Sequence, residues 1–329
     1  MGILHDDVVI INQAEKEGEP SVITVNCPDK AGLGCDLCRV FLFFGLNIVR
    51  GDVTAVLCEL ELTIKKVKVS TTPDGKGLLH TNKRKEDASD HLKNAIWSAM
   101  ISCDIEMVGP EIAACSAESS FLPTAITEDL IPLEIPDELP SSLTSTSVFI
   151  AMDNSLSPGH TLVQIACQDH KGLLFDIMRT LKDYSIQISY GRFTVKQRRK
   201  CEVDLFIVQT DGKKIVDPCK QKSLSSRLEM ELLHPLRVAV VSRGPDTDTE
   251  LLVANPVELN SKGRPLVFHD ITLALKMLNT GIFWAKIRRR MIGDREFEVY
   301  RVLLDEGEGL SVPRSKIEEE VWRMLMGWE

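Results

Sequence analysis

The strongest constraint on the fold is a segment that recurs within the chain at a spacing of 140 residues. Cys27–Leu33 has the sequence CPDKAGL, and Cys167–Leu173 has the sequence CQDHKGL. Each copy follows a short run of alternating apolar residues, which predicts a strand, and each opens an apolar stripe of helical spacing. We therefore predict a repeated unit of strand, tight loop and helix, and such a repeat fixes the architecture before any single residue is interpreted.

Two further traces of this unit occur in the chain. The helical stripe of the second copy recurs 94 residues later, at Val267 and Ile271. A shorter apolar trace that begins at Val53 predicts a helix over 52–60, followed by a strand over 62–70. The chain is thus predicted to contain four copies of the unit, not all of them complete.

The copy between 148 and 244 is the most complete. After its first strand and helix it contains a second strand, a basic turn, a third strand, a second helix and a final strand. The predicted strands are 162–167, 186–195, 202–208 and 236–241, and the predicted helices are 173–184 and 222–233. The order βαββαβ indicates a ferredoxin-like sandwich, an α+β fold whose two helices cover one face of an antiparallel sheet.

The loop that opens the first helix gives these modules a family resemblance. It has the pattern Asp-x-x-Gly-Leu at Asp29–Leu33 and again at Asp169–Leu173. A βαββαβ module with this loop resembles an ACT domain, and several in tandem resemble the plant ACT-domain-repeat (ACR) proteins. The phrases Arg243–Asp246 and Leu252–Leu259 are similar to one subgroup of that family.

The resemblance extends over about 22–110 and 148–326. It implies a non-catalytic regulatory protein whose tandem ACT modules bind a free amino acid as an effector. The alternative is an interaction scaffold whose ACT sheets pair edge to edge, with copies of the same chain or with other proteins, and bind no metabolite. The sequence contains no phosphate-binding Gly-Lys loop, serine nucleophile elbow or kinase motif set, so we expect no enzyme and no cofactor.

The N-terminal half departs from the module pattern. The equivalent helix positions Leu37 and Val53 are 16 residues apart, which is too short for a complete module. We therefore infer an internal deletion near 50–54 that truncates and fuses the first two modules, and a splice form or a gene-model error would both produce it. Because a helix between the second and third strands does not suit a ferredoxin-like sheet, poor packing is expected over 50–87.

The resulting domain organisation has four parts. Residues 1–110 are predicted to form a composite of two incomplete ACT modules, and 111–147, rich in Ser, Thr, Pro and Glu, a linker. Residues 148–244 form a complete ACT module, and 245–329 form a C-terminal ACT module that lacks a clear last strand.

By the family resemblance, a ligand pocket forms where the glycine loop of one module meets the start of the second strand of its partner. A glycine turn leaves backbone N–H groups free at a helix N-terminus, which suits a ligand carboxylate. The alternative is that the glycine only permits the turn and the aspartate caps the helix. The intact unit is the more credible site. The candidates are Asp29, Gly32, Leu33 and Asn47 in the first unit, and Asp169, Gly172, Leu173 and Gln187 in the intact unit.

Composition further limits the classes of partner that the chain is expected to bind. A formal net charge of −9 argues against a general nucleic-acid binder, because phosphate binding needs a basic field. No apolar run approaches the roughly 20 residues that span a bilayer, and the first residues are acidic where a signal peptide is basic. A cytoplasmic protein is expected, with the nucleus not excluded. The partners expected are therefore a free amino acid and other ACT modules.

Neither of two tempting metal motifs is expected to bind a metal. Cys35 and Cys38 form a C-x-x-C, but they align with Phe175 and Met178, which predicts packing positions on a helix. The pair at 269–270 resembles the His-Asp pair of metal phosphohydrolases but has no further His or Asp cluster nearby. The nine cysteines are odd in number and scattered, which is typical of free thiols.

Overall fold

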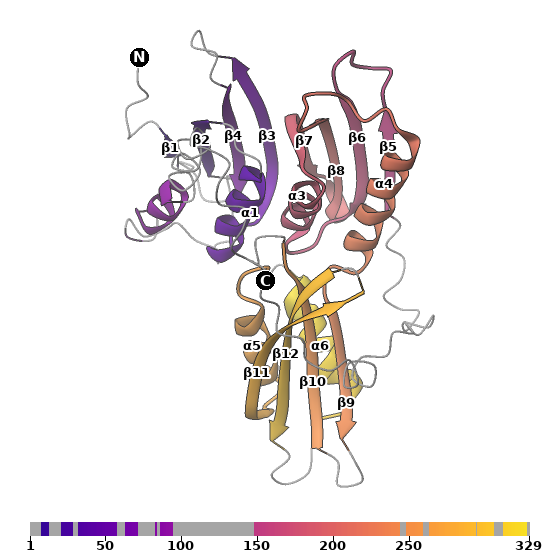
Figure 1. Ribbon diagram of the computed structural model, residues 1–329. Helices are drawn as coiled ribbons and strands as arrows, with labels where there is room; N and C mark the ends of the chain where they lie inside the picture. The colour runs from indigo at the N-terminus through magenta and orange to yellow at the C-terminus, as the bar shows by residue number, and fades with distance from the viewer. Residues whose placement is uncertain are drawn as a thin grey trace, which may run out of the picture.

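The chain forms two antiparallel sheets with helices packed against them (Figure 1). Within the residues that the structure describes, one sheet has eight strands and the other has four. Figure 1 shows the N-terminal and middle modules side by side, with the C-terminal module beneath both. The computed structural model describes residues 8–12, 21–28, 32–57, 63–71, 83, 86–94, 148–243, 248–258, 263–293, 295–305 and 312–327.

Each of the three modules has the element order ββαββα. The first contains β1 (Val9–Asn12), β2 (Val22–Pro28), α1 (Leu33–Phe43), β3 (Ile48–Leu57), β4 (Thr63–Thr71) and helical residues 86–94. The middle module contains β5 (Phe149–Asp153), β6 (Thr161–Gln168), α3 (Leu173–Asp183), β7 (Ile186–Val195), η3 (Gln197–Arg199), β8 (Lys200–Gln209) and α4 (Pro218–Leu233). The C-terminal module contains β9 (Arg237–Arg243), β10 (Asp248–Pro256), α5 (Val267–Met277), β11 (Gly281–Ile292), β12 (Arg295–Asp305) and α6 (Arg314–Met326).

Local sequence explains these elements. Along β8 buried and exposed side chains alternate over most of the strand, as expected for one face on a core. On α3 the residues Leu173, Ile177 and Leu181 are buried at helical spacing. Helix α4 begins where Asp217 accepts a hydrogen bond of 2.8 Å from the Cys219 N–H, followed by proline in the first turn. Among the described residues, no helix is both long and apolar enough to cross a membrane.

The prediction of tandem ferredoxin-like modules is confirmed, but one strand joins a different module from the one expected. The strand predicted over 236–241 to close the middle module is β9, and it pairs with β10 of the C-terminal sheet. Its place in the middle module is filled by β5, which pairs with β6. Because β9 belongs to the C-terminal sheet, that module has the strand that the sequence pattern did not show. Strands β9 and β10 are joined by a short connection, and sequential strands usually pair.

The helix predicted over 52–60 is wrong where the structure describes it. Residues 52–57 continue β3, which pairs along its length with β4; residues 58–62 lie outside the described residues. The apolar spacing fits a helix, but the β-branched residues Val53, Thr54 and Val56 suit a paired strand equally well. The first module therefore has the same strand order as the other two, and β3 and β4 form the hairpin that a ferredoxin-like sheet needs.

Other predictions for this region are covered only in part. The helix predicted over 88–101 is present at 86–94, while the strand predicted over 103–108 and the linker 111–147 lie outside the described residues. Much of the stretch 50–87 expected to pack poorly also lies outside them, although 50–57 and 63–71 are ordered strands of the large sheet.

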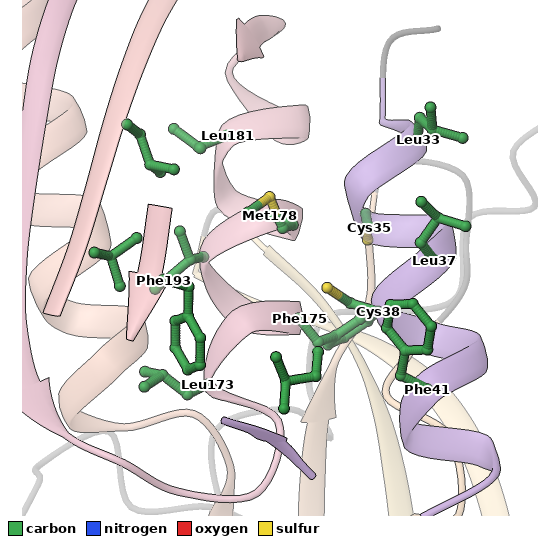
Figure 2. Close-up of a cluster of buried hydrophobic side chains, with 14 of the residues drawn as sticks. Leu33, Cys35, Leu37, Cys38, Phe41, Leu173, Phe175, Met178, Leu181 and Phe193 are labelled. Atoms are coloured by element: carbon green, nitrogen blue, oxygen red, sulfur yellow. The ribbon is translucent and has the colours of Figure 1, made fainter. Parts of the chain in front are cut away.

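The first two modules share one hydrophobic core (Figure 2). Figure 2 shows Cys35 and Cys38 of α1 on the side that faces Phe175 and Met178 of α3. Phe175 is 1% exposed, and burying such a side chain contributes about 2–3 kcal/mol to stability. The C-terminal module has its own core around Ile271 of α5.

Candidate functional site

The candidate site lies along the seam between the first and middle modules. Strands β3 and β7 pair antiparallel there, so that the sheet continues from one module to the other. Asp52 lies opposite Arg192, and each is the equivalent of the other in the 140-residue repeat. The two modules are therefore related by an approximate two-fold axis through this pair, and α1 packs on α3 across the same axis.

A large cavity opens where the glycine loop of the first module meets the start of β7. Gly32 and Leu33 line one side, and Ile186, Gln187 and Ile188 line the other. The empty space measures about 910 Å³, a figure that includes open solvent at the mouth of the cavity. The walls are largely apolar and include Leu37, Cys38, Phe41, Leu174, Met178 and Phe193.

A second, smaller cavity of about 300 Å³ occupies the position related to the first by the approximate two-fold axis. Here Asp169, Gly172 and Leu173 of the middle module face Leu46 and Ile48 at the start of β3. Each cavity therefore combines the loop of one module with the second strand of the other.

The structure brings the predicted residues together in this crossed arrangement. Gly32 and Leu33 share a cavity with Gln187, and Asp169, Gly172 and Leu173 share one with the residues on either side of Asn47. The Oδ1 atom of Asn47 is buried and accepts no hydrogen bond from any described residue. Asp29 lies outside the described residues.

Both loops need glycine for steric reasons. Gly32 and Gly172 have φ angles of +83° and +91°, in the left-handed region that side chains disfavour. A Cβ at Gly32 would lie 2.5 Å from Cε of Lys182, and a Cβ at Gly172 would lie 3.0 Å from Nε of Arg264. Each turn is thus covered by a cation from another element.

Residues of the C-terminal module contact the glycine loop of the middle module. The buried Arg264 guanidinium lies against Gly172 and donates to the Leu325 carbonyl oxygen. The Lys171 N–H donates to the Met326 carbonyl oxygen at 2.9 Å, and the Lys171 ammonium donates to Asp270 at 2.6 Å. The loop of the middle module is thus held by the C-terminal module, while the larger cavity lies at Gly32 of the first unit.

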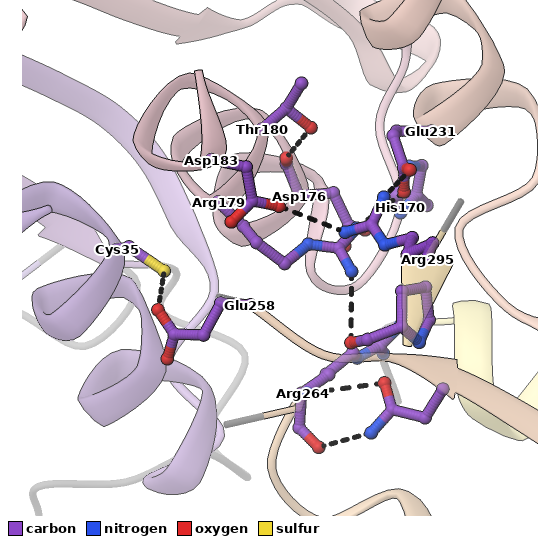
Figure 3. A network of polar contacts seen from close by, with 12 residues as sticks. Cys35, His170, Asp176, Arg179, Thr180, Asp183, Glu231, Glu258, Arg264 and Arg295 are labelled. Atoms are coloured by element: carbon purple, nitrogen blue, oxygen red, sulfur yellow. Dashed lines mark hydrogen bonds and ion pairs between the residues drawn. The ribbon is translucent and has the colours of Figure 1, made fainter. Parts of the chain in front are cut away.

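A buried carboxylate lies behind the larger cavity. Glu258 of the C-terminal module forms ion pairs with Arg39 of α1 and with Lys182 of α3, the latter at 2.8 Å. Figure 3 shows the Cys35 thiol pointing at the same carboxylate, to which it donates at 3.7 Å. Burial works to lower the pKa of Lys182, but the Glu258 hydrogen bond and the Asp36 charge raise it above its usual value. Lys182 therefore remains charged where it lines the cavity.

Sequence reasoning missed the residues that the C-terminal module contributes. Glu258 belongs to a phrase that supported the family resemblance, but nothing in its pattern indicates contact with α1. Arg264 belongs to Gly263–Leu266, which replaces the Asp-x-x-Gly pattern in the third copy, and that difference is the one signal of a different role. Lys182 belongs to the α3 pattern as an ordinary polar position.

The two motifs weighed for metal binding have other environments. Figure 2 shows Cys35 and Cys38 on the face of α1 that packs on α3, and both are buried. Burial raises the pKa of the Cys38 thiol to about 12, so it stays protonated at neutral pH. On α5 the His269 side chain is 64% exposed while Asp270 is buried against Lys171.

Acid should destabilise the fold through His170. Burial and the nearby Arg264 charge lower the pKa of His170 against the opposing effect of Asp176, and its Nε2 accepts no hydrogen bond from the described residues. The unfolded chain then binds more protons, so stability falls as pH drops through the ordinary histidine pKa of about 6.5. We expect urea midpoints to fall less between neutral pH and pH 5 in His170→Gln than in wild type. An equal fall of the urea midpoint in the two proteins would contradict this role of His170.

Three modules with this shared strand order, two of them joined in one sheet, define a tandem ACT-repeat protein. The family model described as "ACR9-like, ACT-like domain" matches 149–246, and that of the C-terminal region of "ACT domain-containing protein ACR9" matches 249–327. The model of the N-terminal region of ACR10 matches 11–58.

The chain belongs to the ACR family of plant ACT domain-containing proteins. It is 51% identical to ACR10 and 40% identical to ACR9 of Arabidopsis thaliana, and each alignment covers 100% of both chains. A bifunctional uridylyltransferase/uridylyl-removing enzyme of Gluconobacter oxydans is 35% identical over 94 residues, but these cover only 28% of this chain and 9% of the enzyme.

The comparisons also fit the internal deletion. The alignment with ACR10 spans 417 residues, 88 more than the 329 of this chain, which is about the length of one module. The ACR10 N-terminal match extends through 50–54 to residue 58, and 48–57 form one strand. The junction inferred near 50–54 therefore stays a prediction. Loss of one repeat length would join the first half of one module to the second half of the next, which would give the ordinary strand order.

Proposed function

We propose that this chain is a non-catalytic regulatory protein that binds a free amino acid with an apolar side chain at the seam of its first two modules. The observation that carries the proposal is the cavity between Gly32 and Gln187. Its walls are mainly aliphatic and aromatic, which suits an apolar side chain. Gln187 and the charged Lys182 supply polar groups at the rim for the ammonium and carboxylate of an amino acid.

The same geometry provides a route for the signal. Lys182 lines the cavity and also pairs with Glu258 of the C-terminal module. A ligand carboxylate near Lys182 would compete with Glu258, and therefore the ligand would alter the docking of the C-terminal module. A ligand shifts such an equilibrium only by its difference in affinity between the two arrangements.

Thermal-shift and calorimetric titration of the whole chain with the twenty amino acids tests this function. At about 100 times the Kd a ligand stabilises the fold by about 2.7 kcal/mol, which is a shift of several degrees. Gln187→Ala should weaken that ligand roughly fivefold, as expected for one lost hydrogen bond. Gln164→Ala changes a glutamine on β6 that bonds Asp204 on the exposed surface, and it should leave affinity unchanged. No shift with any amino acid would refute the proposal.

The scaffold alternative also has an observation in its favour. Strand β11 of the C-terminal module is an exposed sheet edge with apolar side chains. Because this edge lies in a different module from the cavity, ligand binding and edge pairing are compatible.

A further inference from the structure

A row of cations runs along β11 on one face of the C-terminal sheet. Alternate side chains of a strand point to the same face, so Lys286, Arg288 and Arg290 form this row. Arg288 lies opposite Val299 of β12. The core that α5 and α6 cover contains Val302, which lies an odd number of residues from Val299 and therefore points to the other face. The cation row is thus on the face of the lower sheet that these two helices do not cover (Figure 1).

The row has no counter-ion among the residues that the structure describes. Lys286 and Arg288 are exposed and Arg290 is half-buried, and none of the three forms an ion pair within those residues. A neighbouring cation on the same face is paired, because Arg301 of β12 contacts Glu250 at 2.8 Å. The row is therefore a local positive patch on a chain whose formal net charge is −9.

The module fold does not require these cations, since the equivalent strands carry other residues. By the 94- and 140-residue spacings, β11 corresponds to β7 and β3. At the first two positions of the row, β7 has Arg192 and Thr194, and β3 has Asp52 and Thr54. Arg192 lies 3.6 Å from Asp52, so its charge is compensated. The cation row therefore distinguishes β11 from the two strands equivalent to it.

The spacing of the row suits an extended acidic segment. Alternate side chains of a strand are about 6.8 Å apart, and an extended peptide has the same spacing. Trp284 and Ile292 continue the row on the same face, one at each end, and Ile292 packs on a small apolar cluster that includes Val299. A segment with three carboxylates at alternate residues and an apolar residue at each end would therefore complement the row in both charge and polarity.

We propose that this face of β11 binds an extended acidic segment of a partner protein, with carboxylates at alternate residues that pair with Lys286, Arg288 and Arg290. Charge complementarity favours this occupant. A nucleic acid or an anionic membrane extends far beyond three cations and would meet the negative field of the rest of the chain. A short acidic segment contacts the row alone. The contact belongs to a different module from the cavity at Gly32, so it does not depend on an amino acid ligand.

Fluorescence anisotropy with the full chain tests the proposal. The probe is a labelled peptide in which Glu alternates with Ser between two Leu residues, and its affinity should fall as salt is added. A peptide of the same composition with its Glu residues consecutive should bind several times more weakly, because its carboxylates miss the spacing of the row. Arg288→Glu should weaken the first peptide roughly tenfold, since an attractive pair becomes a repulsive one. Lys222→Glu makes the same change of charge at an exposed position of α4 and should leave affinity unchanged.

A charge-swapped peptide shows whether the contact is direct. With Lys at its middle acidic position, the peptide should bind Arg288→Glu more tightly than it binds wild type. The proposal is overturned if wild type does not bind the acidic peptide, or if Arg288→Glu binds it equally well with unchanged circular dichroism. Binding of oligouridylate or phosphatidylserine vesicles without binding of the peptide would assign the row to a phosphate ligand instead. An affinity that rises when Glu134, Asp137 and Glu138 are changed to Gln would assign it to an acidic segment of this chain and exclude the external partner.

Discussion

Replacing Arg179 by methionine should lower the free energy of unfolding by about 3–5 kcal/mol, the usual effect of removing one partner from a buried ion pair. The guanidinium is 0% exposed and pairs with Asp176 at 3.0 Å and with Glu231 at 2.8 Å. It also donates to the Pro256 carbonyl oxygen of the C-terminal module at 3.1 Å (Figure 3). Methionine fills most of the space but leaves the Asp176 carboxylate buried and without its cation.

Urea denaturation followed by circular dichroism measures this loss, with Lys196→Met as the control. Lys196 also pairs with a carboxylate, Glu202, but these two side chains are 55% and 51% exposed. Such surface pairs contribute about 0–1 kcal/mol. Adding Asp176→Asn to Arg179→Met should recover part of the loss because it removes the uncompensated charge. A loss below about 1 kcal/mol in Arg179→Met would contradict the prediction.

Arg179 takes part in a buried contact between the middle and C-terminal modules. Its partners come from α3, α4 and the last residue of β10, so one side chain joins two modules. Arg295 of the C-terminal module pairs with the same Glu231 and with Asp183. Burial and the neighbouring arginines lower the pKa of Arg295 to about 9, which reflects how many cations meet at this contact.

Much of the architecture was predictable because it depends on local periodicity. The strand predicted over 186–195 and the helix predicted over 173–184 match β7 and α3 closely. The glycine loops were predictable because glycine adopts the positive φ of their turns most readily, although Leu266 has a φ of +64° at the equivalent position of the third copy. The sheet to which a strand belongs was not predictable. The alternation of apolar and polar residues marks 236–241 as a strand but does not say which neighbour it pairs with.

Contacts between modules were the least predictable. Glu258 and Arg264 are far in sequence from Arg39 and Gly172, and no periodic pattern links them. The family resemblance implied that the loop of one module would face the second strand of another, and the cavities have that geometry. It did not imply that Arg264 of the third module would lie against Gly172 of the middle module.

Replacing Glu258 by glutamine should lower the free energy of unfolding by about 2–3 kcal/mol, less than the full buried-pair value because its partners keep some water contact. The carboxylate is 0% exposed, while Arg39 and Lys182 are 19% and 14% exposed. Since the pKa of Lys182 is raised, its stabilisation is complete below the unfolded lysine pKa of about 10.4 and is lost as pH rises through the folded value. The difference between wild type and Glu258→Gln should therefore be full at neutral pH and smaller in strong alkali.

A double-mutant cycle separates this ion pair from general loss of packing. Glu258→Gln, Lys182→Met and the double variant are compared by urea denaturation at neutral pH, with Glu202→Gln as the exposed control. We expect a coupling energy of about 1–2 kcal/mol between Glu258 and Lys182, and a coupling near zero would contradict a direct pair. Because Lys182 also lines the larger cavity, release from Glu258 should leave its ammonium with the more distant Asp36, 3.8 Å away, and more available to a ligand carboxylate. Glu258→Gln should therefore bind an amino acid more tightly than wild type while being less stable, and calorimetry on the same samples shows whether the two effects occur together.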